Sequence, residues 1–491
     1  MKHFTTFLFS LFSLGLFAQY TTPGEGATYT LGDLVEMSEG VVTEENGDYF
    51  IHAELTIALN DTLTINDIDV YIDEDVRIVA AGGFLVSNAK LTSPDEDQIY
   101  HGGLRFEETA HVIIDEATIS YGGSVRVITP DFKISNSLLT KQINGAASSA
   151  VLAFSNGKPE IINCEFIDND YAAISSPGNG AVAPVIEGNY FHANGTKNSN
   201  RPQINLGPTG PDTTFIRNNT VIGVDSLDRV GGISVGLLLG GTGRAVVENN
   251  EIVNNRYGIN YMGADLITLT RDNQILGNDN ESNPMMGGSG ISITGAGETN
   301  LHVILGNTIS DNLWGITLIN SVYANLGEID NPEIGPGNNF FDGNGNGGVI
   351  YALYNNGPND QWAQGNCWIA SNPEATLEDA AEVIFDAADG EYGEVFFDPM
   401  GQCVPDAVGE VDFNHIAKLY PNPTFGDTRL ELGAPAVSYT IYDLTGREVE
   451  TRDLTSAGNT VTIRTGKFTP GLYIVRVDGE NFRAATKLIV R

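Results

Sequence analysis

One short pattern recurs through the middle of this chain: a polar residue, usually Asn, with an aliphatic or aromatic residue two positions later. Successive copies lie 23 to 34 residues apart. They begin at Asn136, Asn189, Asn219, Asn250, Asn273, Asn307, Asn339 and Asn366, and Cys164 occupies the same place in its own unit. Repetition at a period of about 20 to 50 residues is typical of a solenoid, whose units stack on their neighbours. The irregular spacing predicts units that carry loops of different length.

Each unit is expected to wind once around an axis and to add a short strand to each of several parallel sheets. An Asn at the bend tolerates left-handed dihedral angles and can hydrogen-bond the backbone or the Asn of the next unit. A second signature follows some anchors, at Asn255–Ile259 and Asn312–Ile316 and more loosely at Asn169–Ala173. A β-propeller or a set of sandwich domains is the alternative, but neither predicts one Asn-anchored strand per unit.

Residues 27–130 are expected to form the first coils, with strands such as Leu55–Leu63 and Val76–Val86. Helical periodicity is absent until near the end of this region, where Leu377–Phe385 reads as a short helix. The sequence therefore predicts an all-β architecture over residues 20–405.

This pattern resembles the right-handed parallel β-helix (pectin-lyase-like) superfamily over roughly residues 50–370. Gly365–Trp368, Asn372–Glu374 and Gly393–Pro399 resemble the closing segment of many bacterial β-helix proteins, although Ile369 replaces a Gly of that pattern. The resemblance implies a C-terminal cap over about residues 365–400, which would protect exposed strand edges from pairing with other chains.

The last part of the chain has a different pattern. Short segments of alternating polarity, each bounded by Gly, Pro, Asn or Asp, predict a small antiparallel β-sandwich. The strings LYPNPTFGDTRLEL, YTIYDLTGREV, FTPGLYIVRV and the final KLIVR resemble the type A C-terminal sorting domain of the type IX secretion system of Bacteroidetes. The resemblance covers residues 418–491. It implies contact with the secretion machinery, passage across the outer membrane, removal of the domain, and then surface anchoring or release. Residues 406–417 read as a linker.

Residues 1–19 read as a secretory signal peptide. Lys2 provides the positive start, Phe7–Phe17 is an apolar run of suitable length, and Ala18 offers a small residue at the cleavage point. No later stretch reaches the roughly 18 apolar residues of a membrane span. The chain is therefore expected at the cell surface or outside the cell.

Charge is unevenly distributed. The chain has 25 basic and 63 acidic residues, of which 10 and 8 lie in residues 418–491, leaving 15 and 55 in the preceding 417. Such an acidic surface repels phosphate backbones and anionic lipid, which argues against nucleic acid and membrane surfaces as partners. It also disfavours a polyanionic glycan, unless cations or a local basic patch intervene.

Three cysteines do not make a disulfide framework. Cys367 and Cys403 lie near each other in sequence and could pair in an oxidising extracellular setting. Cys164 would then be left as a buried small hydrophobic residue.

The fold alone does not decide between catalysis and binding, because parallel β-helices include pectate lyases, polygalacturonases and noncatalytic surface proteins. Hydrolysis needs two carboxylates that face one glycosidic bond, whereas Glu107 and Glu108 would point to opposite faces of a strand. A lyase needs a basic residue. The central coils offer Lys158, Lys197, Arg201, Arg217, Arg244, Arg256 and Arg271. Arg217, Arg244 and Arg271 each precede an anchor Asn and could line up on successive coils.

Other candidates each have a functional and a structural interpretation. His101 could be catalytic or part of a coil, and the seven histidines have no zinc-ligand spacing. The Asp168–Asp170, Asp279–Glu281 and Glu328–Asn331 loops could bind Ca²⁺ or be solvated turns. Tyr257 and Trp314, and loosely Tyr171, could stack on sugar rings or pack the bend.

The sequence thus favours a secreted, noncatalytic adhesin or glycan-binding β-helix protein, with an extracellular polysaccharide or a surface glycan as partner. The alternative is a polysaccharide lyase or glycoside hydrolase. No cofactor is expected with certainty, although Ca²⁺ is possible, and the sequence identifies no catalytic residue. A groove lined by stacked Arg, Lys and carboxylates would favour the enzyme, whereas a smooth flank of Asn, Thr and aromatic residues would favour binding.

Overall fold

The computed structural model describes residues 19–403, except 97, 144–149 and 296–299, and residues 417–490, except 421, 423, 425, 433–435, 444–446, 455–459, 470 and 480–482. The chain divides into two compact units, one ending at Cys403 and the other comprising Val404–Arg491. Nearly all of the predicted signal peptide and of the predicted linker lies outside the described residues.

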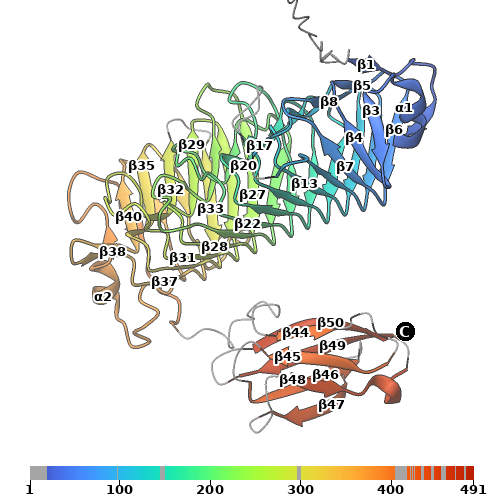
Figure 1. Cartoon of the computed structure of the whole chain (residues 1–491). Helices are drawn as coiled ribbons and strands as arrows, with labels where there is room; N and C mark the ends of the chain where they lie inside the picture. The colour runs from blue at the N-terminus through green and yellow to red at the C-terminus, as the bar shows by residue number, and fades with distance from the viewer. Residues whose placement is uncertain are drawn as a thin grey trace, which may run out of the picture. The chain divides into compact units, whose positions relative to one another are not determined.

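The first unit is a parallel β-helix built from three long sheets, here called sheets A, B and C (Figure 1). Sheet A has 14 strands, sheet B has 14, from β2 (Thr28–Thr30) to β43 (Val395–Phe396), and sheet C has 13, from β3 (Val42–Glu45) to β37 (Phe340–Asp342). The strands of sheet A are β1 (Tyr20–Thr21), β5 (Leu55–Ile57), β8 (Arg77–Ala80), β11 (Gly103–Phe106), β14 (Val125–Val127), β17 (Ala150–Phe154), β20 (Ala172–Ser175), β23 (Ile204–Leu206), β26 (Ile233–Gly236), β29 (Ile259–Gly263), β32 (Ser289–Gly295), β35 (Trp314–Asn320), β40 (Leu353–Asn356) and β42 (Ile384–Phe385).

The chain visits the sheets in turn. From β26 in sheet A it continues to β27 (Gly243–Glu248) in sheet B and β28 (Glu251–Val253) in sheet C, and then returns to sheet A as β29. Neighbouring coils pair in parallel, and the described exceptions at the sheet ends include the antiparallel pair of β3 and β4 (Asp48–Ile51). The predicted solenoid is therefore confirmed. The predicted segments Leu55–Leu63 and Val76–Val86 each contain two strands separated by a bend, because β6 (Thr62–Asn66) and β9 (Gly83–Ser87) belong to sheet B.

The core consists of rows of one side chain per coil. In sheet A, one inward row runs Ile174, Ile204, Ile233, Ile259, Ile291, Ile316 and Leu353. All seven are fully buried. In sheet C, the rings of Phe166 and Phe191 stack at 4.9 Å between centroids. Each coil thus buries its apolar face only against the coils on either side, which is how a solenoid builds a continuous core.

A ladder of buried Asn side chains runs along the bend between sheets B and C. Its members are Asn189, Asn219, Asn250, Asn273, Asn307, Asn339 and Asn366. The backbone N–H and the Nδ2 of Asn219 both donate to Oδ1 of Asn250, at 3.0 and 2.9 Å, and Nδ2 also donates to the carbonyl of Ile186. Asn250 makes the same bonds to Asn273. The anchor Asn of the repeat is therefore a hydrogen-bonding residue shared between coils.

A second ladder follows the bend between sheets C and A. It runs through Asn169, Asn194, Gln203, Asn255, Asn278, Asn312 and Asn344. The second sequence signature marks three of these residues, but Gln203 joins the ladder from outside the pattern. Both bends are thus held by amide side chains that bond from one coil to the next.

The prediction is wrong at Asn136, by one residue. Leu138 pairs with Glu165, so that Ser137 and not Asn136 lies level with Cys164. The predicted left-handed backbone also belongs to the residue before each anchor. Asn218 and Asn249 have φ of 56° and 55°, whereas the ladder residues that follow them do not have positive φ. The left-handed turn and the hydrogen-bond ladder are therefore assigned to two adjacent residues.

Helix α1 (Leu31–Met37) covers the N-terminal end of the stack (Figure 1) and was not predicted. Its N terminus has a capping box between Thr30 and Asp33, and Leu31 and Leu34 are buried in the core. A helix of 7 residues is too short for its period to be read from a sequence window of about 11 to 18 residues.

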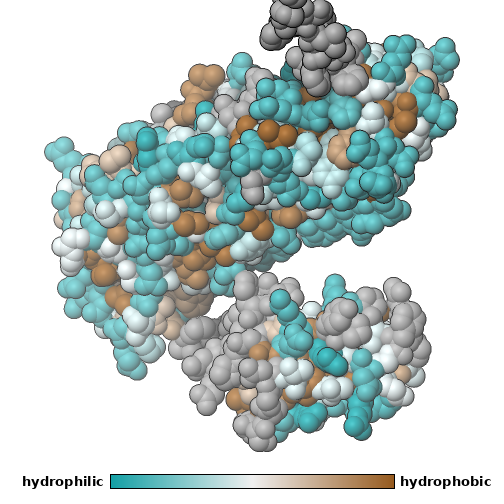
Figure 2. Space-filling view, in the orientation of Figure 1, coloured by the Kyte–Doolittle hydropathy of each residue, from teal (hydrophilic) through white to brown (hydrophobic). Residues whose placement is uncertain are grey.

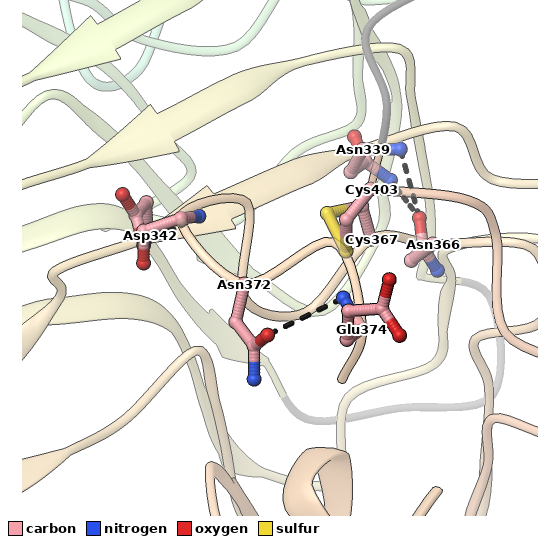
Figure 3. The surroundings of a disulfide bond; sticks show 8 residues. Asn339, Asp342, Asn366, Cys367, Asn372, Glu374 and Cys403 are labelled. Carbon is pink, nitrogen blue, oxygen red and sulfur yellow. Dashed lines mark hydrogen bonds between the residues drawn. A yellow bond between two sulfur atoms is a disulfide. The ribbon is translucent and has the colours of Figure 1, made fainter. Parts of the chain in front are cut away.

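The C-terminal end carries the short helix α2 (Leu377–Ala381), so the predicted helix at 377–385 ends early and passes into β42. Cys367 and Cys403 form a disulfide with a Cα–Cα distance of 4.8 Å, which confirms the proposed pair, and Cys164 is buried and free. Figure 3 shows the disulfide next to Asn366, the last ladder residue, which is bonded by Asn339. The disulfide thus ties the end of the first unit to its last coil.

The second unit has two antiparallel sheets. One contains β44 (Ala417–Tyr420), β45 (Thr428–Leu432) and β48 (Thr460–Ile463). The other contains β46 (Ser438–Asp443), β47 (Glu448–Asp453), β49 (Gly471–Asp478) and β50 (Arg483–Val490). Leu430, Tyr439, Ile441, Val475 and Leu488 belong to its buried core. This arrangement agrees with the predicted β-sandwich.

The ladder predicts a large effect of Asn250→Ala in the full-length mature protein. The change leaves the carbonyls of Ile216 and Glu248 and the N–H of Asn219 without this partner. We expect the free energy of unfolding of the β-helix to fall by about 2–4 kcal/mol, since each buried group left unpaired costs about 1–3 kcal/mol. Denaturant titration would measure it. Asn66→Ala, at an exposed Asn at the end of β6, is the control, and equal effects of the two changes would contradict the ladder's role.

The disulfide predicts sensitivity to reductant. It closes a segment with a sequence separation of 36 residues, for which chain entropy gives about 3–4 kcal/mol of stabilisation. We expect a thiol reductant to lower the unfolding midpoint of the wild-type protein. The double variant Cys367→Ser, Cys403→Ser should unfold at that lowered midpoint with or without reductant. A midpoint that reductant does not change would contradict the prediction.

Candidate functional site

A row of outward side chains follows sheet A for nine coils. Consecutive members are paired in register: Arg126, Ala153, Ser175, Asn205, Ser234, Asn260, Ser292, Thr317 and Tyr354. At a strand spacing of about 4.8 Å the row is about 38 Å long. Most members are small and carry a hydroxyl or an amide group. Since inward and outward residues alternate along each strand, this row is the outer counterpart of the aliphatic core row.

All members of this row except Ala153 line a groove with a cavity volume of about 1070 Å³, and they form its floor. Residues 176–178 and Leu238, which follow strands of sheet A, line it together with residues 199–202 and 284–287, which precede such strands. Loops of different length at the two edges of the sheet therefore provide the walls. Leu238 and Met285 are 72% and 86% exposed, so large apolar side chains lie on both sides of a polar floor.

Arg256 connects two wall loops. Its guanidinium donates to Oδ1 of Asn200 and to the carbonyl of Met286, with the Nε bond to Met286 at 2.9 Å. Trp314 is fixed at the edge of the groove, because its Nε1 donates to the carbonyl of Pro284 at 2.9 Å. The groove is therefore pre-formed, with its walls held by side chains of the coils beneath.

Aromatic rings gather toward the C-terminal end of the groove. The ring of Trp314 lies 4.6 Å from that of Tyr351 and 4.9 Å from that of Tyr354. Tyr354 in turn stacks on Phe385 at 4.5 Å. The register places Tyr257 and Trp314 in one row, two coils apart, and both line the groove. Burial raises the pKa of Tyr257 to about 12, so its phenol is neutral at physiological pH.

The lining of the groove differs in charge from the rest of the first unit. Its described residues contain three arginines, Arg126, Arg201 and Arg256, and no Asp, Glu, Lys or His. The face of the β-helix seen in Figure 2 is mostly hydrophilic, with small separate groups of hydrophobic side chains. In a chain of net charge −38, the groove is thus a local region without carboxylates.

Tyr257 and Trp314 are the predicted candidates that the structure brings together, along with Arg201 and Arg256 from the set of central basic residues. Tyr171 is not among the lining residues. Sequence reasoning missed Arg126 and the Ser, Asn and Thr floor. A signal for Arg126 exists, since its neighbours Val125 and Val127 are both buried, as expected for an outward residue between two inward ones.

The predicted alignment of Arg217, Arg244 and Arg271 is wrong. Arg217 and Arg271 lie in one row of sheet B, but Glu248 stands between them on the intervening coil, and Arg244 pairs with Thr213 and Ile267 in another row. Arg217 forms an ion pair with Glu187 at 2.9 Å and Arg271 with Glu248 at 2.7 Å. Lys158 and Lys197 are likewise paired, with Asp212 and Asp170. These cations balance neighbouring carboxylates and do not form a patch.

His101 is part of the coil interior. It is 1% exposed, its Nδ1 accepts from the N–H of Gly103, and its ring lies against Gly122. Burial lowers its pKa to about 4. His302 is also buried, bonds Thr268 and has its pKa lowered by burial to about 3. Neither ring reaches the groove, so the structural interpretation of His101 applies.

Side chains of two of the three candidate Ca²⁺ loops are paired with other groups of the protein. Asp168 pairs with Lys141, Asp170 pairs with Lys197, and Asn169 belongs to the second ladder. Glu328 accepts hydrogen bonds from Asn325 and Asn331. Across the described part of the chain, no group of three or more His, Cys, Asp or Glu side chains is arranged to hold a metal ion.

Comparison with known proteins supports both parts of the architecture. A family described as "Right handed beta helix region" matches residues 129–326, and one described as "Secretion system C-terminal sorting domain" matches residues 418–491. A comparison with curated proteins found no match. Among solved structures, the periplasmic alginate epimerase AlgG and a mutant of it are 11% and 12% identical, with TM-scores of 0.44 and 0.45. Each alignment covers 76% of this chain and 82% of the other. At these scores the likeness assigns no activity.

The fold defines a right-handed parallel β-helix protein with a groove along one sheet. Its C-terminal unit is a sorting domain of the type IX secretion system, so the protein interacts with that machinery and is secreted to the cell surface or the extracellular space. Within the described residues, no helix is long and apolar enough to span a membrane.

The buried histidines predict a pH dependence of stability. His101 has a pKa of 6.5 when unfolded and about 4 when folded, so the unfolded chain binds the proton more tightly. The stability contributed by the neutral His101 is therefore fully present above about pH 6.5. As the pH falls toward 4, this group lowers the free energy of unfolding by about 2–4 kcal/mol. His302 acts in the same direction.

Denaturant titrations between pH 7 and pH 4 would test this, with the wild-type protein compared with His101→Gln. The variant should keep only the part of the decline that His302 and the carboxylates produce. An unchanged slope in the variant would show that His101 does not carry the effect.

Proposed function

We propose that the protein is a noncatalytic adhesin or glycan-binding component of the cell surface or extracellular space, and that a linear polysaccharide binds along the groove of sheet A. The observation that carries the proposal is the floor row, which offers a hydroxyl or amide group on most coils from Ser175 to Thr317. A polymer of repeating hydroxylated units meets matching partners at regular intervals on such a floor.

The aromatic end of the groove supports the same ligand class. Sugar rings have one apolar C–H face and a polar edge, and they pack on exposed aromatic faces while their hydroxyls bond to nearby polar groups. Trp314 has its indole N–H occupied by Pro284, which leaves the ring as the group available to a ligand. The apolar walls at Leu238 and Met285 offer further contact for C–H faces.

The groove also bears on the catalytic alternative. A glycoside hydrolase needs two carboxyl groups about 5 to 10 Å apart on either side of the scissile bond. The described lining residues contain neither Asp nor Glu. A lyase needs a proton acceptor, and Tyr257, whose pKa is raised to about 12, is a poor base at neutral pH. These features favour binding over turnover.

Trp314→Ala tests the proposal. The full-length mature protein would be screened on immobilised plant, algal and host polysaccharides, and Kd measured for those retained. We expect the change to weaken binding at least about tenfold, because an aromatic anchor of an interface commonly contributes more than about 1 kcal/mol. Trp362→Ala is the matched control, since Trp362 is 42% exposed on β41 (Gln361–Trp362) of sheet B, away from the groove.

Asn260→Ala, which removes an outward amide from the floor, provides a second variant if the loss of the Trp314 ring disturbs the neighbouring tyrosines. The same screen would record reducing ends and unsaturated uronates. Product release from any glycan would contradict a noncatalytic role, and binding that neither groove variant weakens would contradict the site.

A further inference from the structure

Arg126 is the one charged residue of the floor row and stands at its N-terminal end, next to Ala153. On the preceding coil, the residue paired with Arg126 is another arginine, Arg105. Arg105 is already neutralised, because it forms an ion pair with Glu107. For Arg126, no hydrogen bond or ion pair to another described residue is present. Its side chain is partly buried, and burial together with the charge of Arg105 lowers its pKa. A partly desolvated guanidinium without a counter-ion is a costly feature that an anionic ligand would relieve.

The other arginines of the groove do not play this part. The guanidinium of Arg256 is used by Asn200 and Met286 in holding the walls, and Arg201 lies exposed on the wall at residues 199–202. From Ser175 to Tyr354 the floor row contains no charged side chain. The groove therefore offers one cationic position on its floor, at its N-terminal end, followed by about 29 Å of neutral floor.

We propose, resting on the glycan-binding function above, that the ligand is a largely neutral polysaccharide with sparse acidic groups, and that Arg126 binds one such carboxylate or sulfate. A glycan with a charge on every unit would place most of its charges over a floor that has no cation to meet them. The 55 acidic residues among the first 417 would add long-range repulsion. A single acidic substituent on Arg126 avoids both costs and fixes the direction and register of the chain in the groove.

The test compares glycans that differ in charge density, with the full-length mature protein. The probes are glucuronoxylan and its carboxyl-reduced form, a sparsely sulfated agaran and its desulfated form, and polygalacturonate. We expect one acidic member of the two pairs to bind about tenfold more tightly than its neutral form, and more tightly than polygalacturonate. Which pair responds distinguishes a carboxylate from a sulfate ligand.

Arg126→Gln should raise the Kd of the acidic glycan to that of its neutral form and remove the salt dependence of binding. Arg244→Gln, at an exposed arginine of sheet B outside the groove, is the matched control, and equal thermal midpoints of both variants would exclude misfolding. Tightest binding of polygalacturonate, or an Arg126→Gln variant that still prefers the acidic form, would overturn the proposal.

The outcomes distinguish a failure of the role of Arg126 from a failure of the glycan-binding function. Binding that Trp314→Ala weakens and that Arg126→Gln leaves unchanged would overturn the role of Arg126 and keep the glycan-binding groove. Retention of none of the five probes, nor of any glycan in the wider screen, would overturn both.

Discussion

The hydrogen bond from one Asn side chain to the next is the interaction on which the rest of this structure depends. Each ladder Asn satisfies backbone groups of its own bend and of the adjoining coils, so a buried bend is left with few unpaired polar groups. Because an amide can bond only a neighbour at strand spacing, the ladders keep the coils at a constant separation. Every other row, aliphatic inside and polar outside, stays in register as a consequence.

That register explains which features could be predicted from sequence. The anchor period, the aliphatic rows and the disulfide depend on residues whose types recur or are rare, and these were recognisable. The alignment of Arg217, Arg244 and Arg271 failed because loops of variable length separate the coils, so the distance of a residue from its anchor does not fix its row. The shift at Asn136 has the same origin, since both Asn136 and Ser137 can form a bend. The short helix α1 depends on tertiary packing of two leucines and not on a periodic face.

The groove was beyond prediction for a related reason. Its floor consists of Ser, Asn and Thr residues that also occur in every turn of this sequence, and only strand register shows that Ser234, Asn260 and Ser292 form one line. Tyr257 and Trp314 were recognisable because they follow anchors of the second ladder at equal distance. Arg126 comes before Asn169, the first residue of that ladder, and no recurring motif marks it.

The placement of charge gives the groove its character. Arg217 and Arg271 of sheet B are matched by glutamates on neighbouring coils, so that their charges are locally balanced. Sheet A instead has a nearly neutral floor with one arginine that lacks such a partner among the described residues. A solenoid repeats its chemistry from coil to coil, and a uniform floor would let a polymer slide in steps of one unit. One unmatched charge breaks that degeneracy, because only one register of a sparsely charged chain places an anion against Arg126. Specific recognition of a repetitive ligand therefore requires the irregular residue as much as the repeating ones.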